Sequence, residues 1–148
     1  MSIVQPVFDW IQKYAIKSIV NAPCGGRDCQ EFVNRGVQKV LGVNIQPSSD
    51  PLHVAGDLHT WRPDGEWDAA YINCIFCNQL HGMDGKPSRD FATLARNYAS
   101  WPVKYLIVYD TSYDTDWAPM FKESGWNVIE SAQGEGPPTR VEMWSRAA

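Results

Sequence analysis

The 148-residue sequence lacks several features that would each point to a particular class of protein. No run of 18 or more apolar residues occurs, so we expect no membrane-spanning helix. Residues 1–17 carry no basic segment ahead of their apolar residues and no small-residue cleavage motif, so we expect no signal peptide. Only four cysteines are present, too few for a disulfide scaffold, which favours a reducing, cytoplasmic location.

A basic excess is missing as well. The chain has 13 Lys and Arg against 17 Asp and Glu, a net charge of −4. Proteins that bind nucleic acid usually present a basic face, so we expect no DNA or RNA partner. No internal repeat, linker or low-complexity segment interrupts the chain, and residues 1–148 are expected to form a single domain.

What the chain does contain is an alternation of short apolar runs and amphipathic segments. The apolar runs predict strands at residues 17–22, 39–45, 53–57, 67–76, 103–110, 126–132 and 139–146. Helical spacing predicts helices at residues 5–15, in a segment that contains Cys29 and Phe32 and ends at Gly36, at 88–100 and at 114–125.

Strands that alternate with helices predict a mostly parallel sheet covered on both faces. The last two strands are joined by residues 133–138, which are too few for a crossover and predict an antiparallel pair. The expected fold is therefore α/β: Rossmann-like and doubly wound, with a mostly parallel seven-stranded sheet that ends in a C-terminal antiparallel hairpin.

Residues 18–45, "SIVNAPCGGRDCQEFVNRGVQKVLGVNI", carry the pattern of a nucleotide-type site. In such sheets the ligand lies beyond the carboxyl ends of the strands, where glycines in the first turn allow close approach. The residue that ends the second strand, here Asn44, faces the ribose hydroxyls. The turn "PCGGRD" is not Gly-x-Gly-x-x-Gly, so a dinucleotide fits poorly, and its glycines could also simply form the turn.

Five segments in order resemble the motifs of the class I S-adenosylmethionine-dependent methyltransferases. "NAPCGGR" is similar to that family's acid-x-Gly-x-Gly loop, and "GVNI" to its second strand, which ends in an acid. "AGDL" is similar to the third motif, and "WDAAYINCIFCNQLHG" to the strand behind the methyl-transfer centre. Residues 121–146 resemble the closing helix and hairpin, so the resemblance covers roughly residues 5–146.

The resemblance implies that S-adenosylmethionine is the cofactor. It assigns the methionine part to Pro23, Cys24, Gly25 and Gly26, and the ribose and adenine to Asn44, Ile45, Asp57 and Leu58. The sulfonium end falls to Asn73 and Cys74, and Asn21 stands where the family has an acid near the cofactor's ammonium.

Two departures from the family pattern bear on affinity. Asn21 and Asn44 replace acids, and an amide accepts one hydrogen bond and donates one where a carboxylate accepts two charge-assisted bonds. Each replacement is expected to cost about 1–2 kcal/mol, roughly tenfold in affinity. We expect a weakened site rather than an abolished one.

Methyl transfer needs alignment and, for a weak nucleophile, a general base. The candidate bases are His81, in the loop after the fourth strand, and Asp110, at the end of the fifth. His81 could equally be a solvent-facing loop residue, and Asp110 could cap the following helix.

Zinc is conceivable because Cys74 and Cys77 form a C-x2-C pair, Cys24 and Cys29 form a C-x4-C pair, and Cys24 could lie near Cys74. Cys29 is better explained as a core residue, and His53 and His59 lack ligand spacing, so no metal is expected.

Seven tryptophans are many for this length. Most fall on helix stripes or strand faces, but Trp61 and Trp101 lie in loops, where they could line an acceptor pocket, contact another protein or anchor the loops half-buried. The chain has no [DNS]-P-P-[YFW] stretch, which such folds use to methylate amino groups on bases.

The leading hypothesis is a small methyltransferase for a small molecule or a protein side chain, with an acceptor site that is either shallow or completed by a partner protein or a second copy. Gly25, Gly26 and Asp57 favour this enzyme. A non-catalytic methyltransferase-fold module for binding, scaffolding or assembly is the main alternative, favoured by Asn21 and Asn44. A third alternative is an enzyme that cleaves the same cofactor.

Overall fold

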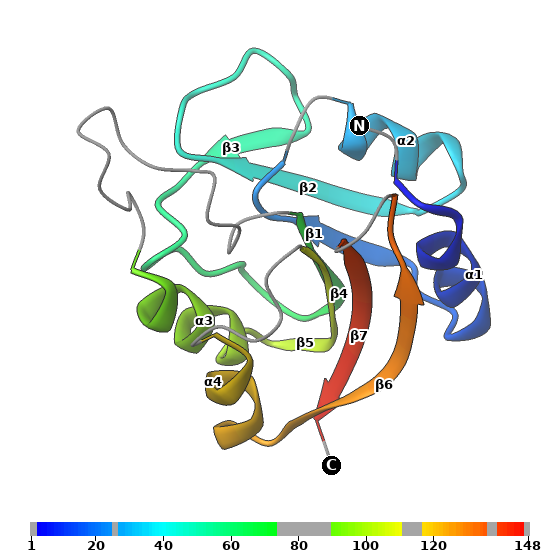
Figure 1. The fold of residues 1–148 in the computed structure, drawn as a ribbon. Helices are drawn as coiled ribbons and strands as arrows, with labels where there is room; N and C mark the ends of the chain where they lie inside the picture. The colour runs from blue at the N-terminus through cyan, green and yellow to red at the C-terminus, as the bar shows by residue number, and fades with distance from the viewer. Residues whose placement is uncertain (1–2, 25–26, 74–89, 111–116, 136–138, 147–148) are drawn as a thin grey trace.

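The structure, a computed structural model, describes residues 3–24, 27–73, 90–110, 117–135 and 139–146 (Figure 1). Its sheet has seven strands in the order β3-β2-β1-β4-β5-β7-β6. The strands are β1 (Ser18–Asn21), β2 (Lys39–Asn44), β3 (His53–Ala55), β4 (Trp67–Asn73), β5 (Val103–Asp110), β6 (Trp126–Gln133) and β7 (Arg140–Arg146). The pairs from β3 to β5 are parallel, and β7 pairs antiparallel with both β5 and β6. The predicted sheet and hairpin are confirmed.

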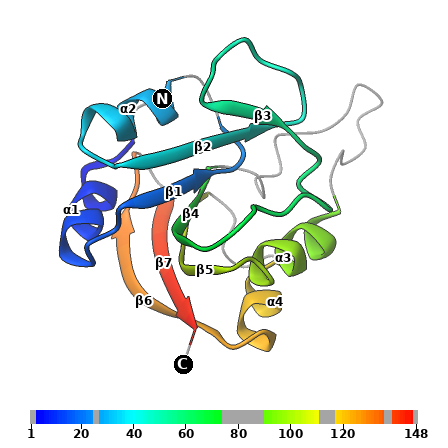
Figure 2. The ribbon, with the colours of Figure 1, turned by 180° about the vertical axis from the view of Figure 1, so that it is seen from behind.

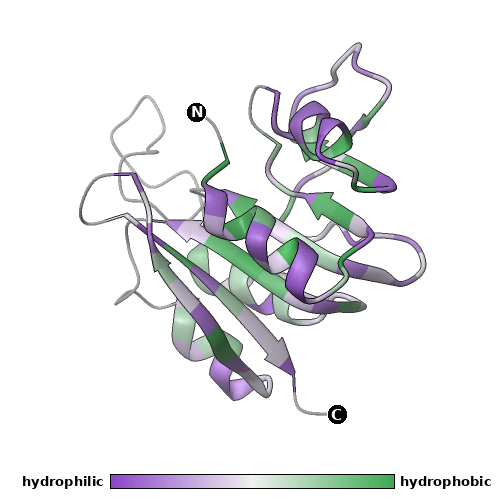
Figure 3. Cartoon of the chain, turned by 90° about the vertical axis from the view of Figure 1, so that its right-hand side faces the viewer, coloured by the Kyte–Doolittle hydropathy of each residue, from purple (hydrophilic) through white to green (hydrophobic). Residues whose placement is uncertain are grey.

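Helices cover both faces of this sheet, as predicted (Figures 1 and 2). One face carries α1 (Gln5–Lys13) and α2 (Asp28–Asn34), and the other carries α3 (Phe91–Ala99) and α4 (Trp117–Glu123). The strand side chains alternate between the two layers: in β4, Ala69 and Tyr71 join the core that includes Phe8 and Phe32, whereas Ala70 and Ile72 join the core that includes Trp101. The helices are banded in hydrophilic and hydrophobic colours in Figure 3, as amphipathic helices should be.

The helix ends differ from the sequence expectation for local reasons. The helix predicted at 88–100 begins at Phe91, because Asp90 is its N-cap and its Oδ1 accepts a hydrogen bond from the Thr93 backbone N–H at 3.1 Å. The first helix ends at Lys13, and Ala15 then adopts a positive φ of 52°. None of the described helices is both long and apolar enough to cross a lipid bilayer.

The tryptophans form much of the core on the α3/α4 face. Trp101, Trp117, Trp126 and Trp144 are at most 1% exposed. Trp61 is half-buried and packs edge-on against Trp101, with ring centroids 5.5 Å apart. Since Trp101 is fully buried, it is a loop anchor, and of the two loop tryptophans only Trp61 reaches the surface.

Short connections follow β2 and β3 at the carboxyl edge of the sheet. Residues 45–52 join β2 to β3 and residues 56–66 join β3 to β4, both without a helix. The last residues of the parallel strands, including Asn21, Asn44 and Asn73, therefore lie along one edge of the sheet, where the sequence places the ligand.

Candidate functional site

Asn21 and Asn73 end the neighbouring strands β1 and β4. Asn21 is fully buried, and the buried Oδ1 atoms of both side chains have no hydrogen-bond partner among the described residues. The Nδ2 of Asn73 donates to Asp28 Oδ2 at 3.3 Å, and burial raises the pKa of that carboxyl. A buried oxygen without a donor costs about 1–3 kcal/mol, so these two acceptors suit a ligand that brings N–H groups to this edge.

The turn after β1 is fastened on both sides. The backbone N–H of Cys24 donates to the Val43 carbonyl at 2.9 Å, which extends the pairing with β2. The Tyr98 hydroxyl of α3 donates to the Ala22 carbonyl at 2.6 Å. Pro23 follows a cis peptide bond and is half-buried. The start of the predicted cofactor turn is therefore fixed by the sheet and by α3; Gly25 and Gly26 lie outside the described residues.

Strand β2 ends at the polar residue Asn44, and the apolar residue Ile45 follows it. The Asn44 carbonyl accepts a hydrogen bond from the Gly56 N–H at 2.8 Å, which brings the segments after β2 and β3 together. Ile45, the next residue, is 72% exposed. A large apolar side chain so exposed at a ligand edge suits contact with the face of a flat ring.

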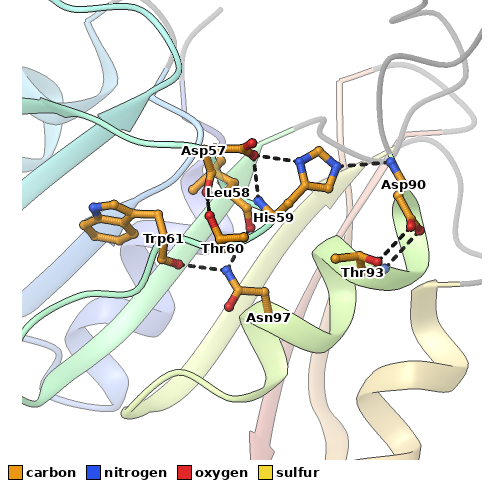
Figure 4. A network of polar contacts seen from close by, with 8 residues as sticks. All are labelled: Asp57, Leu58, His59, Thr60, Trp61, Asp90, Thr93 and Asn97. Atoms are coloured by element: carbon orange, nitrogen blue, oxygen red, sulfur yellow. Dashed lines mark hydrogen bonds and ion pairs between the residues drawn. The ribbon is translucent and has the colours of Figure 1, made fainter.

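Asp57 follows β3 and belongs to a hydrogen-bond network with α3 (Figure 4). Its Oδ1 accepts from the His59 backbone N–H at 3.0 Å and from the His59 ring Nδ1 at 2.7 Å, and these bonds lower the pKa of the Asp57 carboxyl. The Asp90 N–H donates to His59 Nε2 at 3.1 Å, so the ring proton sits on Nδ1. The Asp57 side chain is 56% exposed, and its second oxygen has no described partner, whereas Leu58 is buried in the core.

A second fastening holds the same segment to α3. The Asn97 Nδ2 donates to the Leu58 carbonyl at 2.8 Å and to the Trp61 carbonyl at 2.7 Å (Figure 4). One amide thus pairs two backbone carbonyls of the turn that carries Asp57.

The predicted catalytic residues are only partly placed. His81 lies outside the described residues, as does Cys74 of the predicted cofactor set. Asp110 is fully buried at the end of β5. Residues 111–116, between Asp110 and the described start of α4 at Trp117, lie outside the described residues, so a capping role for Asp110 stays a prediction.

A cluster that the sequence reasoning missed lies on the α2 side of the same edge. Cys24 Sγ is 3.1 Å from Cys29 Sγ and 3.0 Å from His53 Nε2. The hydrogen bond with Cys29 lowers the pKa of Cys24 to about 7, and the same contact raises that of Cys29. His53 has no ligand spacing to the cysteines along the chain, but the β2–β3 register brings it to the two thiols. The available signal was Gly42, a glycine inside a strand.

Hollows found in the described part of the chain lie elsewhere. One of about 530 Å³ is lined by Trp67, Lys104, Arg146 and neighbouring residues at the opposite, amino edge of β4 and β5. Because ligands of open parallel sheets bind beyond the carboxyl ends of the strands, we place the candidate site at the carboxyl edge rather than in this hollow.

No family model and no curated protein sequence matches this chain. Several solved structures do match it in fold. Magnesium protoporphyrin IX methyltransferase from Synechocystis PCC 6803 with bound S-adenosylmethionine has a TM-score of 0.71 at 13% identity, over 96% of this chain and 77% of that one.

Two further matches come from other bacteria. An S-adenosylmethionine-dependent methyltransferase from Clostridium acetobutylicum gives a TM-score of 0.67 at 7% identity, over 96% and 89% of the two chains. The N-methyltransferase NodS from Bradyrhizobium japonicum with S-adenosylhomocysteine gives 0.62 at 9% identity, over 97% and 87%. This chain has the fold of the S-adenosylmethionine-dependent methyltransferases. That methyltransferase fold spans nearly all of the chain, as the sequence resemblance implied.

Proposed function

We propose that this chain binds S-adenosylmethionine across the carboxyl edge of β1, β2, β3 and β4 and transfers its methyl group to a small molecule or a protein side chain. The observation that carries the proposal is the pair of buried, unpartnered oxygens of Asn21 and Asn73. In this proposal the cofactor's ammonium donates a hydrogen bond to the Asn21 oxygen, and the Asn73 oxygen faces the positively charged sulfonium end of the methionine part.

The nucleoside part fits the groups that follow β2 and β3. Asn44 accepts from and donates to the ribose hydroxyls, and exposed Ile45 covers one face of the adenine. The free oxygen of Asp57 accepts from the adenine amino group while His59 holds the other oxygen. This arrangement supports a base-recognising role for Asp57, because the carboxylate is ionised, oriented and open to solvent.

The cofactor supplies a methyl group on a sulfonium, and this chain's residues bind and align it. Asn73 lies at the end of β4, where the sulfonium is expected, and His81 and Asp110 remain the proposed bases. The net charge of −4 favours a small-molecule or protein acceptor over nucleic acid, although one neighbour of similar fold is a 16S rRNA methyltransferase.

A second candidate function is a non-catalytic binding or assembly module of the same fold. Asn21 and Asn44 favour it, because each replaces a carboxylate that would strengthen cofactor binding. The two candidates differ in turnover, and the module has no need of the cofactor.

Titration calorimetry with S-adenosylmethionine and S-adenosylhomocysteine tests cofactor binding. We expect micromolar dissociation constants that Asp57→Ala weakens by roughly tenfold, the loss of about one charge-assisted hydrogen bond. Asp64→Ala, which removes an exposed carboxylate on the approach to β4, is the matched control and should leave the affinity unchanged. Absence of heat at millimolar ligand would rule out the enzyme, and binding without transfer of a labelled methyl group to any small-molecule or protein pool would favour the module.

A further inference from the structure

We propose that Cys24, Cys29 and His53 form a zinc-binding site. Their ligand atoms, two Sγ and the Nε2, all lie within 4.8 Å of one another. They come from three elements: the turn after β1, the helix α2 and the strand β3. This site goes beyond the proposed function and does not depend on it.

The three side chains are buried and oriented as ligands. Cys24 is 5% exposed, Cys29 is 1% exposed and the His53 side chain is 8% exposed. His53 Nδ1 is hydrogen-bonded to Ser48 Oγ at 3.2 Å, which turns Nε2 toward the two sulfurs. A metal-bound histidine commonly uses its second nitrogen in this way to fix the ring.

Gly42 leaves room for the three ligands, and Asn21 stabilises the thiolate form of the two cysteines. A Cβ on Gly42 would lie 2.5 Å from His53 Cδ2 and 2.7 Å from Cys29 Sγ, so glycine leaves the room that the cluster occupies. The Asn21 Nδ2 points its N–H groups at Cys24 Sγ, 3.5 Å away, and Cys29 Sγ, 3.8 Å away. Amide N–H groups directed at sulfur stabilise thiolates, the form in which cysteine binds metal.

Sulfur and imidazole ligands in a tetrahedral arrangement select zinc among the common divalent ions. Zinc–sulfur bonds of about 2.3 Å place two tetrahedral sulfurs about 3.8 Å apart. The Sγ atoms are now 3.1 Å apart, sharing a hydrogen bond, so binding requires them to separate by roughly 0.7 Å. Two thiol protons leave as the two zinc–sulfur bonds form.

The Asp50 carboxylate is the fourth zinc ligand, or a nearby negative charge that stabilises the bound ion. Its Oδ2 is 3.7 Å from His53 Nε2, and the carboxylate is 39% exposed, so the ion would be reached from the segment between β2 and β3. Bound zinc would join the β1–α2 turn to β3 and hold the backbone that leads into Gly25 and Gly26. The assigned role is structural support of that turn.

The test uses the full chain, purified without a histidine tag and under reductant. We expect about one zinc per chain by elemental analysis, and cobalt(II) substitution should give the strong visible bands of a tetrahedral ion and a thiolate-to-cobalt band. Cys29→Ser and His53→Gln should each weaken zinc affinity by at least ~100-fold, since loss of a second-sphere contact alone costs 10–100-fold. His59→Gln is the matched histidine control and should keep full zinc content.

Cys29 is buried, so the Cys29→Ser variant could fail to fold. His53 lies nearer the surface, so His53→Gln should still fold and tests the site if Cys29→Ser does not. Zinc should raise the melting temperature of the parent chain and not that of His53→Gln. The proposal is overturned if the reduced parent chain takes up neither zinc nor cobalt at micromolar metal, or if His53→Gln binds zinc as the parent does. A Cys24–Cys29 disulfide in protein kept under reductant, without zinc, would equally overturn it.

Discussion

Gly42 of β2 stands directly opposite His53 of β3, and the imidazole lies where a side chain on residue 42 would be. The space above this glycine also holds Cys29 Sγ. The pairing of β2 with β3 and the thiol–imidazole cluster therefore both require a glycine at position 42.

Gly42→Ala should disturb both. The added methyl group forces His53 and Cys29 to move, which we expect to lower the free energy of unfolding by about 1–3 kcal/mol. Zinc affinity should fall at least tenfold, because the ligands lose their arrangement. Urea denaturation and zinc titration measure the two effects. A variant as stable as the parent, with full zinc affinity, would show that the cluster tolerates a side chain there.

Asp68 predicts a pH-dependent stability. Its Oδ2 accepts from the backbone N–H groups of Lys17, at 2.7 Å, and Ser18, at 3.2 Å, and so ties the start of β1 to β4. Burial raises the pKa of Asp68, but these bonds and nearby Lys104 outweigh it and hold the pKa below its ordinary value. The stabilisation is therefore present above the unfolded pKa of about 3.9 and is lost as the pH falls through the lower folded value.

Asp68→Asn should then cost about 1–2 kcal/mol of unfolding free energy at pH 7. The difference from the parent chain should shrink as the pH falls below about 4, where Asp68 is protonated first in the unfolded chain and then, at lower pH, in the folded chain. Urea denaturation at both pH values measures this, with Asp64→Asn as a control. A difference that stays constant with pH would contradict the assignment.

Tyr98 should affect stability and cofactor binding together. Tyr98→Phe removes the donor to the buried Ala22 carbonyl and should lower the unfolding free energy by about 1–2 kcal/mol. Because that carbonyl begins the turn that leads to Cys24, affinity for S-adenosylmethionine should also fall severalfold. Calorimetry at a temperature where the variant is fully folded separates the effects. Unchanged affinity there would mean that the turn holds its shape without the hydroxyl.

Asn44→Asp tests the ribose assignment, which rests on the proposed function. Restoring a carboxylate at the end of β2 should tighten S-adenosylmethionine binding by roughly tenfold. Asn127→Asp, on β6, makes the same change of charge at an exposed position far along the sheet and is the control. If both variants bind alike, the ribose lies elsewhere.

The fold was largely predictable because its elements carry strong local signals. The β-branched and aromatic residues of β5 predict a strand without any tertiary information. The short connection at residues 133–138 likewise predicts that the last two strands pair antiparallel. The site edge followed from topology, since parallel strands share the edge at which they end.

The thiol–imidazole cluster was not predictable in the same way. Cys24 and Cys29 form a C-x4-C pair, but no spacing along the chain links them to His53, which meets them only because the three-residue strand β3 pairs with β2 in one particular register. Strand register depends on contacts between segments distant in sequence, which residue spacing does not encode.

The Asn97 amide, which pairs the carbonyls of Leu58 and Trp61, makes the turn after β3 an extension of α3. The turn that contains Asp57 is therefore held against α3 by hydrogen bonds and is not a free loop. The adenine end of the proposed site would be rigid before any ligand arrives, so recognition there would demand little reordering of the chain.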